Sequence, residues 1–304
     1  MDFKQLETFV TIAKLKSFSK AADFLFLTQP TISNHMQNLE KELGTILINR
    51  SNKRITLTNA GEILFTHAMD ILNKKEQTLF SLEQFKGKIE GTLEIASSSI
   101  PEQYILPILL NSFHKFYPDV RFNVLHSDSE QVVTSILNGE IDFGIVGAKN
   151  DIKHLNYLEI MEDTMLVIMP FMDHYKSMDE ITIDDLFREK IILREEGSGT
   201  RKIFEQVLMQ HNKTIDDLNI IAYIESTESI KQCIRRGLGI SILSELAVID
   251  EVKSNLLKAV KIKDIEIKRN FYFVFHKYRA LSPLAEAFKN FVLENKNLFQ
   301  IENI

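Results

Sequence analysis

The stretch TQPTISNHMQNLEKELG, residues 28–44, decides the fold of the N-terminal part of the chain. Its apolar residues recur at steps of four, three and four, namely Ile32, Met36, Leu39 and Leu43. This spacing predicts a helix with one face in a core. Pro30 falls in the first helical turn, where proline is tolerated, and Gly44 is expected to end the helix.

The opposite face of this helix carries almost no charge, although a solvated face usually carries Lys and Glu. Short neutral side chains that both donate and accept hydrogen bonds suit the base edges of a DNA major groove. The alternative is a solvated helix in a small packing domain, with polar residues there by chance. The residues expected to contact DNA here are Thr28, Gln29, Pro30, Thr31, Ser33, Asn34, Gln37 and Asn38.

The flanking sequence completes a winged helix-turn-helix over residues 1–59. Helical spacing over residues 2–16 is followed by a second short helix, KAADFLFL, which Ser17 or Ser19 can cap. The stretch ILINRSNKRITLTNAG predicts a two-stranded hairpin. Its basic tip places Arg50, Lys53 and Arg54 where phosphates are expected.

A long linker helix is expected over residues 60–88. No proline occurs there, and an apolar seam runs along it: Leu64, Ala68, Ile71, Leu72, Leu79, Leu82 and Phe85. A helix of this length with no partner in its own small domain is expected to pack against a second copy. The alternative is that it lies on the following domain.

Residues 89–304 predict an α/β domain, entered through the linker GKIEGT at residues 87–92. The strands TLEIAS, VRFNVL and IDFGIVG alternate with helices from Pro101 and Ser129, which indicates a parallel sheet. The pattern restarts at TMLVIM and runs to GISIL. The strand RNFYFVFH and a helix over 283–295 are expected to return to the first half. Two lobes follow, lobe I over about 92–163 and 268–304 and lobe II over about 164–267.

Charge and composition fit an ordinary globular protein of the cytoplasm. The 304 residues carry a net charge of −6, yet residues 1–59 hold eight Lys or Arg against five Asp or Glu. A mildly basic head on an acidic body suggests that only the head meets phosphates. Cys233 is the single cysteine, no apolar run is long enough for a membrane span, and the start lacks the layout of a secretory signal.

Three stretches place small hydroxyl residues where a strand feeds a helix: Ser98 and Ser99; Ser198, Gly199 and Thr200; and Thr227. Helix N-termini with added hydroxyls hold anions well, and ligands of open sheets sit beyond the carboxyl ends of strands. With Gly147, these residues are expected to line an effector pocket between the lobes. The alternative is that they are only helix caps. Glu195 and Glu196 oppose a strongly anionic ligand unless they point away.

The N-terminal motifs resemble those of LysR-type transcriptional regulators. The matching residues occur in the right order: Ala21-Ala22, Thr28-Gln29-Pro30, Ser33, Leu39-Glu40, Leu43-Gly44, Arg50, Leu57-Thr58 and Ala60-Gly61. The resemblance covers the whole chain and implies a winged head, a linker helix and a two-lobed effector domain like periplasmic binding proteins. It also implies double-stranded DNA as partner and a homodimer or homotetramer. Asn34 stands where many members carry Arg, so we expect a phosphate or guanine contact of the family to be absent here or replaced by an amide–adenine pair.

The stretches SSSIPEQYILP, LREEGSGTR and STESIKQCIRRGLGISIL resemble the branch of this family tied to sulfur and selenium metabolism. That resemblance implies a small oxyanion or a sulfur-amino-acid precursor as effector. The chemistry of the residues themselves favours a small, polar, anionic ligand.

Two other classes of function are open to the same fold. A solute-binding transport protein shares the two-lobed architecture, but the first 90 residues and the absence of a signal peptide oppose it. An enzyme could use the cleft, yet the sequence offers no carboxylate pair, Ser–His pair or cofactor fingerprint, so no catalytic residue and no cofactor is expected. The scattered histidines predict no metal site.

Overall fold

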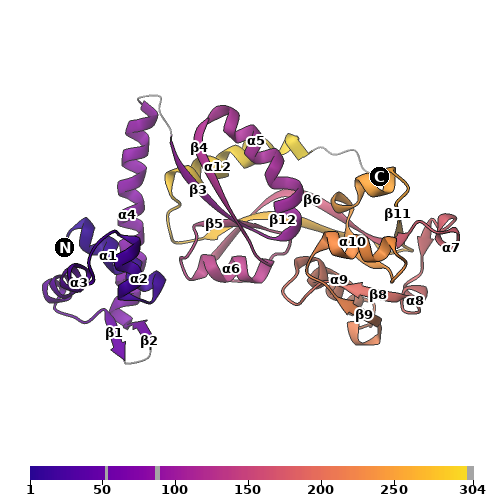
Figure 1. The fold of residues 1–304 in the computed structure, drawn as a ribbon, viewed down its shortest axis with the longest axis horizontal. Helices are drawn as coiled ribbons and strands as arrows, with labels where there is room; N and C mark the ends of the chain where they lie inside the picture. Colours follow the sequence, from indigo (N-terminus) through magenta and orange to yellow (C-terminus); the bar gives the residue numbers. More distant parts are fainter. Residues whose placement is uncertain (52–53, 86–89, 300–304) are drawn as a thin grey trace.

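The computed structural model describes residues 1–51, 54–85 and 90–299, and Figure 1 shows three bodies in a row. A small helical domain lies at one end with a long helix rising from it. One α/β lobe lies in the centre and a second at the far end. The architecture is therefore a winged helix-turn-helix joined to a two-lobed α/β domain, as the sequence predicts.

The N-terminal domain is built on three helices, α1 (Phe3–Leu15), α2 (Phe18–Phe24) and α3 (Gln29–Leu43). The expected cap of α2 forms at Ser17, which accepts a hydrogen bond from the Lys20 amide. Thr28 caps α3 by accepting a hydrogen bond from the Thr31 amide. Ile32, Met36 and Leu39 are fully buried. These caps and this stripe set where α3 begins and which face it buries.

Two details of the expected N-terminal domain are wrong. Leu43 is 40% exposed, because it lies in the last turn of α3, beyond the reach of the small core. The helix α2 ends at Phe24, and Phe26 adopts a positive φ of 54°, so the second half of KAADFLFL is a turn.

The wing and the linker helix follow directly. Strands β1 (Ile48–Ser51) and β2 (Arg54–Leu57) pair antiparallel, and α4 (Asn59–Phe85) runs for 27 residues. The expected linker at residues 87–92 lies partly outside the described residues. The apolar seam of α4 divides: Leu64, Ala68 and Leu72 pack in the N-terminal core, whereas Ile71, Leu79 and Leu82 are exposed.

Lobe I has a parallel core of β4 (Asp119–His126), β3 (Glu90–Ser97) and β5 (Phe143–Val146). A π-helical turn at Pro101–Ile105 leads into α5 (Leu106–Phe116), and α6 (Ser129–Leu137) precedes β5. The chain returns at its end with β12 (Ile267–His276), antiparallel to β5, and α12 (Pro283–Glu294). The predicted return to the first half is confirmed.

One long strand, β6 (Leu155–Pro170), passes from lobe I into lobe II. Its first part pairs with β12, and its last part pairs with β10 (Ser241–Ser244) and β11 (Leu257–Ile262). The sequence predicts only TMLVIM as a strand. Residues 155–163 were not predicted as a strand because polar residues interrupt the apolar run, although this segment pairs with β12 along its length.

Lobe II adds a parallel pair, β8 (Lys190–Leu193) and β9 (Asn219–Tyr223), with α9 (Gly199–Gln210) and α10 (Thr227–Arg235). The shorter elements are α7 (Asp173–Lys176), β7 (Glu180–Ile181), α8 (Ile183–Leu186) and α11 (Ile249–Lys253). One apolar cluster contains Phe143 and Phe273 of lobe I together with Ile192 and Leu243 of lobe II. The lobes therefore share part of their core, and Cys233 packs half-buried against it.

The linker helix also touches lobe I of its own chain. Arg279 stacks on the Phe65 ring with 5.9 Å between guanidinium and centroid, and the Ala280 amide donates to Asp70 at 3.2 Å. Gln77 donates to the Leu281 carbonyl at 3.3 Å. The alternative prediction, that α4 lies on the following domain, therefore holds for one side of the helix. Another side remains apolar and exposed.

Candidate functional site

The polar face of α3 is open to solvent. Gln29, Asn34, Gln37 and Asn38 are exposed, as are Thr28 and Pro30 at the start of the helix, while Thr31 and Ser33 are half-buried. All of these residues lie on or beside one helix, opposite the buried stripe. The helix therefore presents amide and hydroxyl groups to solvent, where they can form hydrogen bonds with base edges.

One hydrogen bond ties α3 to its domain, and a second stabilises the start of the helix. His35 Nδ1 lies 2.9 Å from the Thr8 hydroxyl of α1, which ties the middle of α3 to the helix behind it. The hydroxyls of Thr28 and Thr31 lie 2.8 Å apart and bond to each other. Thr28 and Thr31 therefore serve the helix start, so Gln29 and Asn34 are better placed for direct base contacts.

Only the backbone pairing of the wing bears on its predicted contact with phosphates. Arg50 pairs with Ile55, and Arg54 with Ser51, across the hairpin. Lys53 and the side chains of Arg50 and Arg54 lie outside the described residues. The basic tip therefore stays a prediction.

A polar cavity of only about 10 Å³, room for about one water molecule, lies between the two lobes. It brings together six of the seven residues expected to bind the effector: Ser98, Ser99, Gly147, Ser198, Gly199 and Thr200. All six are buried. The volume is below the roughly 300–1,000 Å³ of typical ligand pockets, so the lobes are closed on each other. Close approach across the cleft needs small residues, because a Cβ on Gly199 would lie 3.1 Å from the Gly147 carbonyl carbon.

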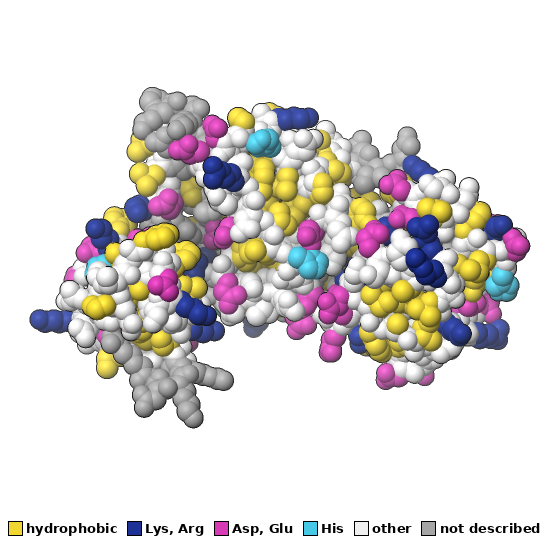
Figure 2. Space-filling view, viewed as in Figure 1, with side chains coloured by type: hydrophobic (Ala, Val, Ile, Leu, Met, Phe, Trp, Pro, Cys, Tyr) yellow, Lys and Arg dark blue, Asp and Glu magenta, His cyan; other side chains and the backbone are white. Residues whose placement is uncertain are grey.

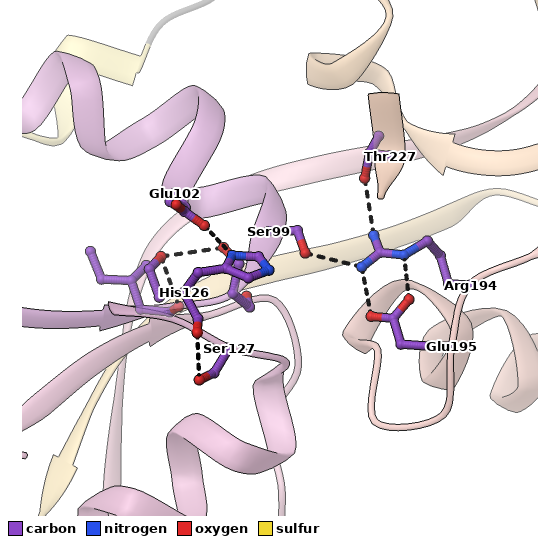
Figure 3. A network of polar contacts seen from close by, with 10 residues as sticks. Ser99, Glu102, His126, Ser127, Arg194, Glu195 and Thr227 are labelled. Atoms are coloured by element: carbon purple, nitrogen blue, oxygen red, sulfur yellow. Dashed lines mark hydrogen bonds and ion pairs between the residues drawn. The ribbon is translucent and has the colours of Figure 1, made fainter. Parts of the chain in front are cut away.

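Arg194 links the lobes and was missed by the sequence reasoning. It follows β8 and is only 4% exposed. Its guanidinium donates to Ser99 of lobe I at 3.0 Å, to Thr227 of lobe II at 3.1 Å, and twice to Glu195 at 2.7 Å (Figure 3). The seventh predicted residue, Thr227, thus reaches the site through Arg194.

Arg269 is the second buried arginine, and the sequence reasoning missed it too. Its Nε donates to Asp163 at 2.7 Å and its Nη1 to Thr200 at 3.0 Å, while its guanidinium lies 4.7 Å from the Phe271 ring centroid. Burial raises the pKa of Asp163, and the ion pair with Arg269 and the Ser244 hydroxyl oppose that rise. The pair joins β12 to β6 where the strands pass between the lobes.

Two polar atoms in the cavity wall are buried without a hydrogen-bond partner. They are Nη2 of Arg269 and Oγ of Ser129, the first residue of α6. A native protein rarely leaves such groups unpaired, because each costs about 1–3 kcal/mol. A guanidinium N–H and a hydroxyl facing one cavity fit an anionic or strongly hydrogen-bonding ligand.

A strand-pattern signal could have revealed Arg269. In IKRNFYF, Arg269 alternates in phase with Ile267, Phe271 and Phe273, which are all buried. A cation on the buried face of a strand needs an anionic partner. Arg194 has a weaker signal, since it only follows the apolar run KIIL.

No group of three His, Cys, Asp or Glu side chains within residues 1–51, 54–85 and 90–299 is placed to hold a metal ion. Across the same ranges, no helix is both long and apolar enough to cross a membrane.

The fold and the two sites define a DNA-binding regulator with a ligand-sensing domain. The family profile described as "Bacterial regulatory helix-turn-helix protein, lysR family" matches residues 3–62, and "LysR substrate binding domain" matches residues 86–297. The chain belongs to the LysR family of transcriptional regulators. Of the three classes considered, the regulator is therefore the one to which the chain belongs.

Similar proteins agree with this assignment. A "Probable RuBisCO transcriptional regulator" of Gracilaria tenuistipitata var. liui is 32% identical, covering 95% of this chain and 94% of its own. "HTH-type transcriptional regulator CysL" of Bacillus subtilis is 31% identical, covering 95% and 94%. The CcmR regulatory domain of Synechocystis, solved in complex with 2-PG, is 28% identical with a TM-score of 0.61, covering 67% and 97%. The two full-length relatives are transcriptional regulators, and the prediction that the chain is a regulator rather than an enzyme is confirmed.

Proposed function

We propose that this regulator binds a pseudo-palindromic DNA operator as a homodimer or homotetramer in the cytoplasm and responds to a small anion held between its lobes. In this proposal α3 contacts base edges, the wing contacts phosphates, and the exposed part of the α4 seam faces a second copy. The observation that carries the sensing function is the pair of buried unpartnered atoms in the inter-lobe cavity.

The DNA contacts rest on the exposed polar face of α3. Gln29 and Asn34 are exposed amides near the N-terminal end of the helix. A recognition helix reads the major groove mainly with its N-terminal residues, and an amide side chain can pair with adenine through two hydrogen bonds. Ser33 is half-buried and has a shorter reach. We therefore expect it to supply a supporting contact.

Operator binding tests this placement of α3. Replacing Gln29 by Ala should weaken binding to a selected operator by roughly 1–3 kcal/mol, because one base contact is lost. Ser33→Ala should weaken it within the same range. Binding to unrelated DNA should change little, because phosphate contacts remain.

Gln210→Ala is the matched control, because Gln210 is an exposed glutamine in the last turn of α9, in lobe II and outside the proposed DNA and subunit contacts. Equal effects of Gln29→Ala and Gln210→Ala on operator affinity would contradict the assignment of α3 as the recognition helix.

The effector class is supported by chemistry and by similarity. Two buried arginines, four serines and one threonine surround the cavity, which favours an oxyanion or a carboxylate over a neutral solute. The resemblance to sulfur and selenium regulators favours a sulfur or selenium oxyanion or a sulfur-amino-acid precursor. The 2-PG complex of the CcmR domain favours a phosphorylated carboxylate instead.

A thermal-shift titration distinguishes these effectors. The full-length protein is titrated with sulfate, thiosulfate, sulfite, selenite, O-acetylserine, 2-PG and simple carboxylates. A ligand that binds only the folded state raises the Tm as its concentration rises. A response confined to sulfur or selenium compounds would support that branch, and a response confined to 2-PG would replace it. Arg269→Met should abolish the response, and a response that survives would contradict the proposed site.

A further inference from the structure

The Arg194–Glu195 pair has the geometry of an arginine holding a bound carboxylate. Nε of Arg194 donates to one carboxylate oxygen of Glu195 and Nη2 to the other, both at 2.7 Å. Two parallel N–H···O bonds of this kind are how arginine recognises the carboxylate, phosphate or sulfate group of a ligand. Here the group in that position comes from the next residue of the chain (Figure 3).

The rest of the Arg194 guanidinium is already engaged. Nη1 donates to Thr227, and Nη2 also donates to Ser99. These bonds fix the guanidinium in the cavity wall with its Nε/Nη2 edge towards Glu195. An incoming anion can therefore reach the preferred edge of Arg194 only if the Glu195 carboxylate leaves it.

The two carboxylates paired with the buried arginines differ in how firmly they are held. Asp163 lies in strand β6, its side chain is 1% exposed, and both Arg269 and Ser244 donate to it. Glu195 lies in the loop between β8 and α9, and its side chain is 18% exposed. Arg194 is the only partner that the hydrogen-bond and ion-pair geometry gives the Glu195 side chain within the described residues. Glu195 is thus the carboxylate that can turn out to solvent.

We propose that Glu195 is an internal stand-in for the effector: it occupies the anion position on Arg194 when the cavity is empty, and an effector anion binds by exchanging with it. This inference rests on the proposed sensing of an anion. The exchange keeps the buried charge balanced, because one negative group replaces another beside Arg194. It also selects for ligands with two anionic oxygens that match the Nε/Nη2 edge.

The exchange explains why acidic residues border a site for an anion. An open groove beside the cavity is lined by Glu130, Asp151, Glu196 and Glu205 together with Arg201 and Lys202. Figure 2 shows acidic side chains gathered along the boundary between the two lobes. The displaced Glu195 carboxylate would lie close to these acidic side chains, and their like charge raises its free energy above that on a neutral surface. The stand-in therefore lowers effector affinity and sets the concentration at which the regulator responds.

Anion affinity of Glu195→Gln compared with Glu196→Gln tests the exchange. Each change removes one negative charge from the same loop, but only Glu195 contacts Arg194. Isothermal titration of the full-length protein with inorganic sulfate, inorganic phosphate and 2-PG gives the Kd. We expect the Kd of the best probe to fall about tenfold or more in Glu195→Gln, because a neutral amide competes less well for Arg194, and about twofold or less in Glu196→Gln.

Several outcomes separate the exchange from the proposed function. Binding by wild type with no gain in Glu195→Gln, or an equal gain in Glu196→Gln, would overturn the exchange and leave the anion site standing. Failure of every probe on folded wild type and folded Glu195→Gln would overturn both. If Glu195→Gln lowers the Tm, Glu195→Asp serves as the second variant, because its shorter carboxylate should hold the two bonds less well and give a smaller gain of the same sign.

Discussion

His276, at the end of β12, is held in its neutral form. Burial, followed by the charges of Arg279 and His154, lowers its pKa to about 4. Its Nδ1 accepts a hydrogen bond from the Tyr278 amide at 3.3 Å, which requires that nitrogen to be unprotonated. The folded protein therefore binds this proton more weakly than the unfolded chain does.

The stability of the sensor should consequently decline as pH falls through the window from about 6.5 to about 4, since the unfolded state takes up the proton first. The free energy of unfolding, measured by urea denaturation across this range, should fall less steeply in His276→Asn, which keeps an acceptor but does not titrate. His114→Asn, at an exposed position of α5, is the control and should follow wild type. Parallel slopes for wild type and His276→Asn would contradict this role.

At the residue scale, the sequence predicted the neutral half of the effector site and missed its charged half. Ser98, Ser99 and Thr200 follow from their places between strands and helices, and the cavity contains all three. The alternation of β12 marks Arg269 as buried, but the partners of Arg269 and the role of Arg194 follow only from the tertiary structure, which brings Asp163, Thr200 and Ser99 within hydrogen-bond distance of the two guanidinium groups. Such a constellation depends on tertiary contacts, which local spacing does not encode.

At the element scale, the start of α4 is pressed against the wing. A Cβ on Gly61 would lie 2.1 Å from the Leu47 carbonyl oxygen, just before β1. That oxygen belongs to the backbone and cannot rotate away as the end of a side chain can. Gly61→Ala should destabilise the N-terminal domain by roughly 1–3 kcal/mol, despite the better helix propensity of alanine.

Chemical unfolding monitored on the N-terminal domain checks this. Ile63→Ala, at a 65% exposed position two residues along, should cost much less. Anion binding by the sensor should be unchanged in both variants. A normal stability for Gly61→Ala would mean that α4 and the wing are not packed this closely.

The elements themselves were predictable where the sequence repeats a single pattern. The helices α3, α4 and α12 have regular apolar spacing and, in α3 and α12, a proline in the first turn. Strand β6 was half missed, because Glu159, Glu162 and Asp163 interrupt its alternation. Asp163 interrupts the apolar pattern because it is buried in an ion pair with Arg269.

At the scale of the whole molecule, α6 connects the effector cavity to the linker helix. Its N-terminal end, at Asp128 and Ser129, lines the cavity. At its C-terminal end the Ile136 and Leu137 carbonyls accept hydrogen bonds from Arg279 at 2.7 and 2.6 Å, and Arg279 stacks on Phe65 of α4. A rigid helix of nine residues, roughly 13 Å long, therefore spans the two sites.

Arg279→Gln should weaken the coupling between them. The expected result is that effector and operator each still bind, while the factor by which effector changes operator affinity falls towards one. Operator titrations with and without saturating anion measure this factor. Lys277→Gln, an exposed change of the same charge two residues away, should keep it. An unchanged factor in Arg279→Gln would mean that the signal leaves the sensor by another route.

The strand β6 runs unbroken from lobe I into lobe II, and the lobes share an apolar cluster. Neither lobe is therefore expected to be inherited separately from the other. Recombination that joined lobe I of one relative to lobe II of another would have to match both the pairing register along β6 and the packing of the shared cluster. The sensor is thus expected to be exchanged between proteins only as a whole, whereas the N-terminal domain, joined through a single helix, can be exchanged alone.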